Sequence, residues 1–288
     1  MATIAVTGAN GFIGSHLIPK LIRENCIVHA IIRSEKKGEI FKNTPVILKL
    51  GDVSDIPSLI NAFQGVDTVI HLVAIIAEEG NLTYEKVIIQ GTRNVVEAAK
   101  KAGVKRIVYI SGLGVESDAV IGHFHAKWQA EQIIIPSGLE YVIFRPSFVL
   151  GPGDYFTMEL VRQVKTGQIN IYGDGEYKMQ PIYINDLTEL FYRASVNPQI
   201  KNRIFDLGGP APMSYNQLVD TVIQILNIPC KKNYRPLKAV TPDIMSSDEL
   251  YILTHDYICD STIVSKAYDV TLTPISEALR RLITKENN

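Results

Sequence analysis

Apolar and polar positions alternate along the first half of the chain with two different periods. Short runs rich in Val and Ile are separated by longer stretches in which apolar residues recur at helical spacing. One such stretch carries an apolar helical face at Val87, Ile88, Gly91, Val95 and Ala98. Runs that are apolar throughout are typical of strands buried on both faces. The pattern therefore predicts βαβ units around a parallel sheet.

The same pattern gives the boundaries of the elements. Strands are expected at Thr3–Thr7, Val28–Ile32, Val46–Leu50, Thr68–Leu72, Arg106–Ile110 and Tyr141–Phe144. Helices are expected between them at Ile13–Glu24, Ile56–Phe63, Tyr84–Ala102 and Lys127–Ile135. This order predicts the α/β class with a doubly wound parallel sheet.

The pattern changes after Pro152, where Gly and Pro become frequent. Ser214 and Gln217 form a predicted capping box that opens a helix through Leu226. The other predicted elements are helices at Phe156–Thr166, Asn185–Ala194 and Thr273–Ile283, a turn at Gly173–Gly175 and a strand at Gln180–Ile184. We expect a main domain of residues 1–152 and a small C-terminal substrate lobe of residues 153–288, with segments near 180–207 returning to the main sheet.

The segment after the first predicted strand carries three glycines spaced as GxxGxxG and leads into a helical pattern. Gly8 permits a tight turn, Gly11 lets backbone N–H groups approach a pyrophosphate, and Gly14 allows the helix to pack closely on the strand. The helix N-terminus adds partial positive charge. The segment thus predicts the cofactor loop of a Rossmann-type dinucleotide-binding domain, whose other members are Asn10, Phe12 and Ile13.

The second predicted strand ends in Arg33 and Ser34. Enzymes that use NAD usually carry an acidic residue here, which holds the ribose hydroxyls and repels a 2′-phosphate. A guanidinium and a hydroxyl favour that phosphate instead. We therefore expect NADP(H) to be preferred over NAD(H), although a solvated basic loop with Lys36 and Lys37 is the alternative interpretation.

Two further strand ends are expected to contact the cofactor. Asp52 and Val53 follow the third strand, where a carboxylate can reach the adenine amino group. The fourth strand ends where the cofactor should cross the sheet, at Leu72, Val73 and Ala74.

Composition narrows the classes of partner. With a net charge of −1, the chain has no overall positive potential to attract the phosphate backbone of nucleic acid, so we expect no nucleic-acid partner. The three cysteines, Cys26, Cys230 and Cys259, lack metal-site spacing and favour a reducing compartment, so we expect a cytoplasmic protein. No room for a signal peptide precedes the first strand, and the apolar run from Val69 to Ala77 is too short to span a bilayer. Peripheral association, or association with a larger complex, stays open.

Several motifs in this order resemble the short-chain dehydrogenase/reductase superfamily, in its extended and atypical branches that include NAD-dependent epimerases and dehydratases. The resemblance runs from Ala5 to about Asp186. Three of its segments look most like the subgroup that contains the NADPH-binding accessory subunit of respiratory complex I and its bacterial relatives. Those segments are 127–131, 144–153 and 180–186.

The resemblance implies a Tyr-x-x-x-Lys pair on one helix face, in which Tyr is the acid/base and Lys binds the nicotinamide ribose. Lys127 matches the Lys, but His123 stands where the family has Tyr. Ser111 is the nearest match to the catalytic Ser, although the alignment puts Gly112 at that position. The family's turn after the sixth strand adds two expected cofactor contacts, Pro146 and Ser147.

Two functions stay open at this stage. A histidine with an ordinary pKa near ~6.5 can exchange protons at neutral pH, so His123 could replace Tyr in an oxidoreductase or epimerase-like enzyme acting on an unidentified small molecule. Alternatively, the chain binds NADP(H) without catalysis, as a structural or sensor subunit. We expect no metal site, because His123 and His125 point to different sides of their helix.

Overall fold

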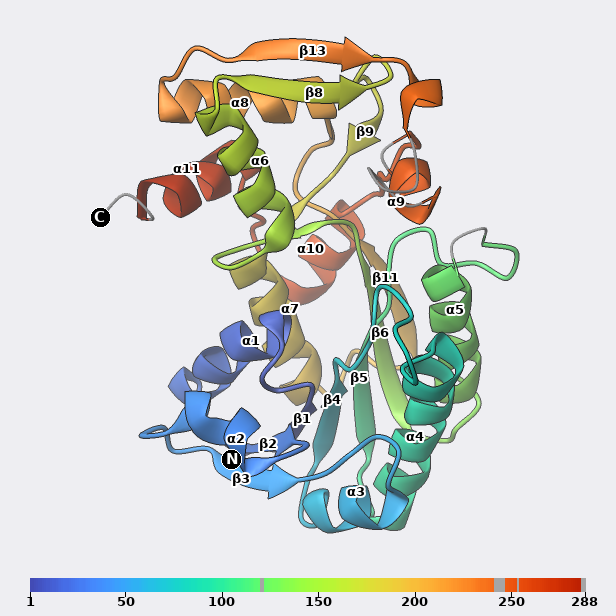
Figure 1. Cartoon of the computed structure of the whole chain (residues 1–288). Coiled ribbons are helices and arrows are strands. Elements are labelled where there is room, and N and C mark those ends of the chain that lie inside the picture. Colours follow the sequence, from blue (N-terminus) through green and yellow to red (C-terminus); the bar gives the residue numbers. More distant parts are fainter. Residues whose placement is uncertain (120–121, 241–246, 253, 286–288) are drawn as a thin grey trace. The chain divides into compact units, whose positions relative to one another are not determined.

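The computed structural model describes residues 1–119, 122–240, 247–252 and 254–285 (Figure 1). The chain divides into two compact units. The first unit consists of Met1–Arg145 and Leu187–Phe205, and the second consists of Pro146–Asp186 and Asp206–Asn288. Each unit is thus built from two separate stretches of the sequence.

A seven-stranded sheet forms the centre of the first unit, in the order β11-β6-β5-β4-β1-β2-β3. Neighbouring strands from β3 to β6 all pair in parallel. This is the predicted α/β, doubly wound arrangement, in which the strand order reverses between β1 and β4. The strands are β1 (Thr3–Thr7), β2 (Ile27–Ile32), β3 (Ile47–Leu50), β4 (Thr68–His71), β5 (Arg106–Ile110), β6 (Glu140–Pro146) and β11 (Arg203–Leu207).

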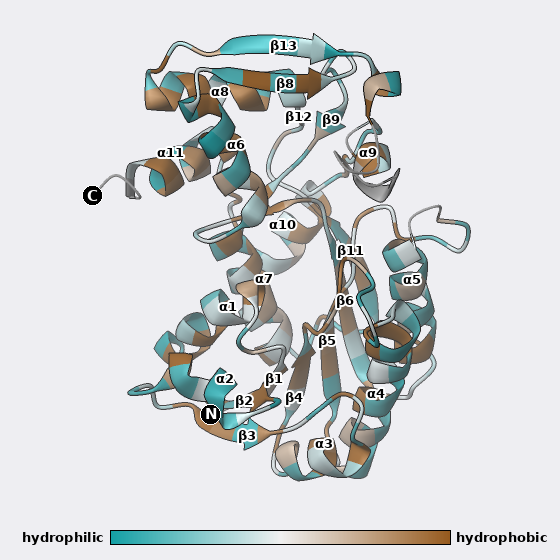
Figure 2. Ribbon diagram, viewed as in Figure 1, coloured by the Kyte–Doolittle hydropathy of each residue, from teal (hydrophilic) through white to brown (hydrophobic). Residues whose placement is uncertain are grey.

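Helices cover both faces of this sheet (Figure 1). One face carries α3 (Ile56–Ala62), α4 (Gly91–Lys101) and α5 (Gly122–Ile134). The other face carries α1 (Phe12–Arg23) and α7 (Ile184–Val196), which are joined by an ion pair between Lys20 and Glu189. Figure 2 shows that the central strands are strongly apolar, because both of their faces are covered.

Most predicted boundaries in this unit agree with the structure to within two residues, but two helices differ. The segment predicted as one helix from 84 to 102 begins with a π-helical turn at Glu85–Gln90, and α4 follows it. Helix α5 starts at Gly122, five residues before the predicted start at Lys127. The apolar period is weak there because polar side chains such as His123 and Lys127 occupy buried positions.

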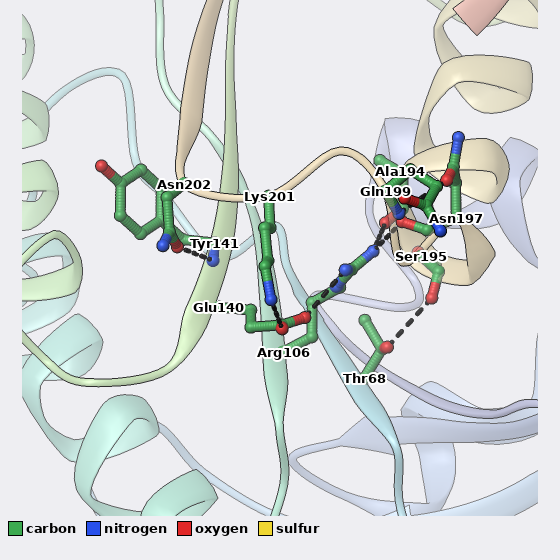
Figure 3. A network of polar contacts seen from close by, with 10 residues as sticks. All are labelled: Thr68, Arg106, Glu140, Tyr141, Ala194, Ser195, Asn197, Gln199, Lys201 and Asn202. Carbon is green, nitrogen blue, oxygen red and sulfur yellow. Dashed lines mark hydrogen bonds and ion pairs between the residues drawn. The ribbon is translucent and has the colours of Figure 1, made fainter.

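A polar network ties the amino ends of β4, β5 and β6 to the last turn of α7 and the segment after it (Figure 3). In β4, Thr68 donates to the Ser195 carbonyl oxygen at 3.1 Å. Arg106, at the start of β5, is 5% exposed and donates to the carbonyl oxygens of Ala194 (2.8 Å) and Asn197. Its other terminal nitrogen donates to Glu140 at 2.8 Å, and Lys201 binds the same carboxylate at 2.7 Å. This network fixes the returning chain at the sheet end opposite the carboxyl edge.

The second unit holds a parallel two-stranded ribbon of β8 (Gln168–Tyr172) and β13 (Lys231–Arg235), with α6 (Tyr155–Lys165) packed on β8. The predicted capping box is confirmed, since Ser214 and Gln217 bond reciprocally at the start of α8 (Tyr215–Leu226). The predicted strand at 180–184 is reduced to two residues. The remaining elements are β7 (Val149–Leu150), β9 (Lys178–Met179), β10 (Ile182–Tyr183), β12 (Met213–Ser214), α9 (Ser247–Ile252), α10 (Thr262–Tyr268) and α11 (Ile275–Lys285).

Within the part of the chain that the structure describes, no helix combines the length and the apolar character needed to cross a bilayer.

The network around Arg106 gives a first prediction. Arg106→Met leaves two carbonyl oxygens and the Glu140 carboxylate without their buried partner, so we expect the free energy of unfolding to fall by about 3 kcal/mol. The matched control is Lys201→Met, which removes a half-exposed partner of the same carboxylate and should cost less than about 1 kcal/mol. Urea denaturation followed by circular dichroism measures both, and equal losses would contradict the role given to Arg106.

Candidate site at the carboxyl edge of the sheet

The glycine segment forms a tight turn between β1 and α1. Gly8 has a φ of +71°, which favours glycine, and its carbonyl oxygen accepts the Gly11 N–H at 3.0 Å. A Cβ on Gly14 would lie 2.4 Å from the carbonyl oxygens of Gly8 and Ala9. No side chain caps the first turn of α1, which begins at Phe12 and Ile13. Backbone N–H groups therefore stand at this helix end without a side-chain acceptor.

The end of β4 lies against this turn. The Leu72 N–H donates to Thr7 at 3.3 Å, and a Cβ on Gly8 would come within 3.2–3.3 Å of the Leu72 and Val73 backbone. Ala74 follows as an exposed residue. The structure thus brings together the glycine loop and the predicted cofactor contacts at 72–74.

Asp52 is bonded by the neighbouring Ser54, and Val53 by Asn94, a residue that the sequence prediction missed. Asp52 Oδ1 accepts two hydrogen bonds from Ser54, at 2.7 and 2.8 Å. Asn94 Nδ2 donates to the Val53 carbonyl oxygen at 2.7 Å. The tetrad Gly91-Thr92-Arg93-Asn94 could have pointed to this contact. It places polar residues on the helix face that packs on the sheet, and buried polar side chains need a hydrogen-bond partner.

Thr92 belongs to the same tetrad and was also missed. His71 is fully buried. Its Nδ1 forms a hydrogen bond with Thr7 Oγ1 (2.7 Å), and its Nε2 forms one with Thr92 Oγ1 (3.2 Å). Burial and the Lys127 ammonium lower the pKa of His71 to about 3, so the ring is neutral at pH 7. It links β1, β4 and α4 directly beneath the carboxyl edge.

Arg33 and Ser34 lie exposed at the end of β2, and Ser34 opens the short helix α2 (Glu35–Gly38). Lys36 and Lys37 are also exposed there. Arg33 and Ser34 are therefore accessible to a ligand that crosses the end of β2.

Lys127 is the buried cation of the site. Its side chain is 9% exposed, and its ammonium donates to the carbonyl oxygens of Ile110 (3.0 Å) and Ser111 (3.2 Å). The ammonium also lies 5.7 Å from the centroid of the Tyr109 ring. Burial lowers the pKa of Lys127 to about 8, although the Glu131 carboxylate acts in the opposite direction.

His123 lies one helical turn before Lys127 and is 8% exposed. Its ring contacts Phe124 and Tyr84 at centroid distances of 4.4 and 6.3 Å. Its buried Nδ1 has no hydrogen-bond partner among the residues that the structure describes. Burial and, second, the Lys127 charge lower the pKa of His123 to about 4. The ring is therefore neutral at pH 7, unlike the ordinary histidine on which the sequence-based hypothesis rested.

Ser111 completes this group. Its backbone N–H donates to the Phe144 carbonyl oxygen at 2.7 Å, and its buried Oγ has no hydrogen-bond partner in the part of the chain that the structure describes. The Lys127 ammonium bonds the Ser111 carbonyl oxygen and acts electrostatically on the His123 ring, so two residues with such an atom surround one ammonium. Buried polar groups are normally satisfied, so the pair indicates a position for a polar ligand. Pro146 and Ser147 belong to the second unit, where the Ser147 N–H donates to Leu207 at 2.7 Å.

These features fit a dinucleotide. The glycine turn and the start of α1 are suited to the pyrophosphate, and 72–74 line the path across the sheet. Lys127 and the unpaired atoms lie at the end of β5, where the nicotinamide half would be held.

Comparisons with known proteins agree with this architecture. The model of the NAD dependent epimerase/dehydratase family matches residues 4–208. Among solved structures, an NADPH-dependent quinone oxidoreductase from Escherichia coli, complexed with NADPH, superposes with a TM-score of 0.79 at 20% identity. That match covers 97% of this chain and 99% of the other.

Two curated relatives have different functions. The N-acetyl-alpha-D-glucosaminyl-diphospho-ditrans,octacis-undecaprenol 4-epimerase of Escherichia coli O157:H7 is 28% identical over 245 residues, which is 78% of this chain and 72% of the relative. The mitochondrial NADH-ubiquinone oxidoreductase 40 kDa subunit of Neurospora crassa is 25% identical over 275 residues, or 90% and 72% of the two chains. The family match spans the whole glycine loop, the strand ends and the Lys127 helix, and on that basis the chain belongs to the NAD dependent epimerase/dehydratase family.

Proposed function

We propose that this chain binds NADP(H) in its first unit and reduces the carbonyl group of a small molecule, with Lys127 as the proton donor. The observation that supports this most directly is the buried ammonium of Lys127 beside two buried, unpaired polar atoms, Ser111 Oγ and His123 Nδ1. NADPH, when bound, supplies the hydride.

Lys127 is suited to the proton transfer. Two of its three N–H bonds are directed at the Ile110 and Ser111 carbonyl oxygens, which leaves one for a ligand. A lysine with a pKa of about 8 remains largely protonated at pH 7, and it gives up its proton more readily than an exposed lysine does. Ser111 Oγ can donate a hydrogen bond to the substrate oxygen and so polarise the carbonyl group.

His123 has a positioning and hydrogen-bonding role in this proposal. A neutral imidazole can donate one hydrogen bond and accept another, but with a pKa of about 4 it carries no transferable extra proton at pH 7. In this proposal His123, at the family's Tyr position, binds the ligand. Lys127, one turn later in α5, supplies the proton.

A second candidate function is binding of NADP(H) without turnover, on a larger complex. The low pKa of His123 favours it, because the residue in the family's acid/base position is then a poor acid. The similarity to the 40 kDa subunit of an NADH-ubiquinone oxidoreductase also supports it. Repeated oxidation of NADPH by any carbonyl compound would exclude this alternative.

Cofactor preference tests the role of Arg33. We expect Arg33→Ala to raise the Kd for NADPH by about tenfold, because it removes a charge-assisted contact to the 2′-phosphate, and to leave the Kd for NADH nearly unchanged. Arg23→Ala, an exposed arginine at the end of α1, is the matched control. Fluorescence titration with both cofactors measures the effect. A wild-type protein that prefers NADH would refute the assignment.

The pH dependence of the reduction tests the proton donor. If Lys127 is the acid, kcat/KM is constant between about pH 6 and 7.5 and falls tenfold per pH unit above about 8, since the ammonium is lost there. Lys127→Met should remove most of the activity.

His123→Gln provides the complementary experiment. Because Gln keeps a hydrogen-bonding group, we expect a smaller loss of kcat/KM than in His123→Ala and the same limb above pH 8. A rate that instead falls through pH 6–7 in the wild type, with a limb that disappears in His123→Gln, would assign the acid function to His123 and overturn this proposal.

A further inference from the structure

The second unit contains a cavity of about 650 Å³ between α6, β8 and α8. This volume lies within the ~300–1,000 Å³ range of small-molecule sites. The lining residues come from segments between 148 and 252 of the chain, and all belong to the second unit. The cavity can therefore be examined as a binding site of that unit alone.

Aromatic rings dominate its wall. Phe148 and Phe156 lie 5.3 Å apart between ring centroids, Phe156 lies 6.5 Å from Tyr215, and Tyr215 stacks on Tyr177 at 5.5 Å with an interplanar angle of 16°. These four rings form a series of contacts contributed by separate parts of the chain, in which Phe148 and Phe156 are inclined by 38° and Phe156 and Tyr215 by 57°. Tyr155, which is 80% exposed, also lines the cavity. An aromatic lining of this kind favours an aromatic ligand.

Of the two arginines that the structure describes on the wall, only one has a carboxylate partner on that wall. Two guanidinium nitrogens of Arg162, Nε and Nη2, donate to the Glu159 carboxylate at 2.7 Å each, so this pair is neutral as a unit. The Arg162 hydrogen bond, the first of several causes, lowers the pKa of Glu159 to about 2, so the carboxylate stays charged and paired. The remaining arginine among the lining residues that the structure describes is Arg235, which is exposed and donates to the neutral Asn170 at 3.3 Å.

Neutral polar groups supply the hydrogen bonds instead. Gln163, Gln168 and Asn170 present amides to the cavity wall. Burial raises the pKa of the Tyr177 phenol, which therefore stays protonated and can donate. Amide and phenol donors match the carbonyl oxygens of an uncharged ring.

We infer that this cavity binds an uncharged, planar ring compound carrying carbonyl groups, of the quinone type, rather than a sugar nucleotide. The inference concerns binding by the second unit and goes beyond the proposed function, so it is tested by binding alone. The four aromatic rings contact the ring of the ligand, and the amides on β8 and α6 hold its oxygens.

Isothermal titration calorimetry of the full chain tests the inference with 2,3-dimethyl-1,4-naphthoquinone as the probe. Both reactive ring positions of this quinone are blocked, so it does not alkylate the three free cysteines. We expect a micromolar Kd for the quinone and at least tenfold weaker binding of UDP-glucose. Tyr155→Ala and Tyr215→Ala should each weaken quinone binding about fivefold or more.

Tyr234→Ala is the matched control, since Tyr234 is a half-exposed tyrosine of the same unit that does not line this cavity. The NADPH-induced thermal shift verifies that each variant is folded. Tighter binding of UDP-glucose than of the quinone, or equal effects of Tyr155→Ala and Tyr234→Ala, would overturn the inference. Oxidation of NADPH is a test of the proposed reductase activity and is measured separately, so its failure would leave the assignment of the cavity intact.

Discussion

A buried ammonium must be solvated by the protein, and the carboxyl edge of the sheet is organised around that requirement. The Lys127 ammonium donates hydrogen bonds to two backbone carbonyl oxygens and lies over the Tyr109 ring. Glu131, the nearest carboxylate along α5, is fully buried and is engaged by Arg145. The lysine therefore keeps a charge that is only partly compensated. Burial and, second, this charge lower the pKa values of His71 and His123, so both rings are neutral at pH 7.

The strands and the glycine turn of the first unit were predicted well, because short segments of sequence determine them. Strands buried on both faces appear as apolar runs, and the turn at Gly8 needs a residue that tolerates positive φ. The hydrogen bonds of Thr92 and Asn94 were missed, since their partners, His71 and Val53, lie far away in sequence. The neutral state of His123 was equally hidden, because it depends on burial and not on the motif.

The second unit was less predictable for a related reason. Its strands are only two to five residues long, and β8 pairs in parallel with β13 across more than sixty residues of sequence. Such short strands carry almost no periodic signal. The capping box at Ser214 was found because its reciprocal hydrogen bonds need only four consecutive residues. The aromatic cavity could not be predicted, since its wall assembles from side chains that share no local pattern.

The Arg106 network has a consequence for the order in which the protein can be made. The first unit needs Leu187–Phe205, and its buried arginine needs the carbonyl oxygens of Ala194 and Asn197. A ribosome translating the message has therefore produced the first segment of the second unit before the first unit can close. Until then the edge of β6 that pairs with β11 has no partner strand, and Arg106 lacks its carbonyl acceptors.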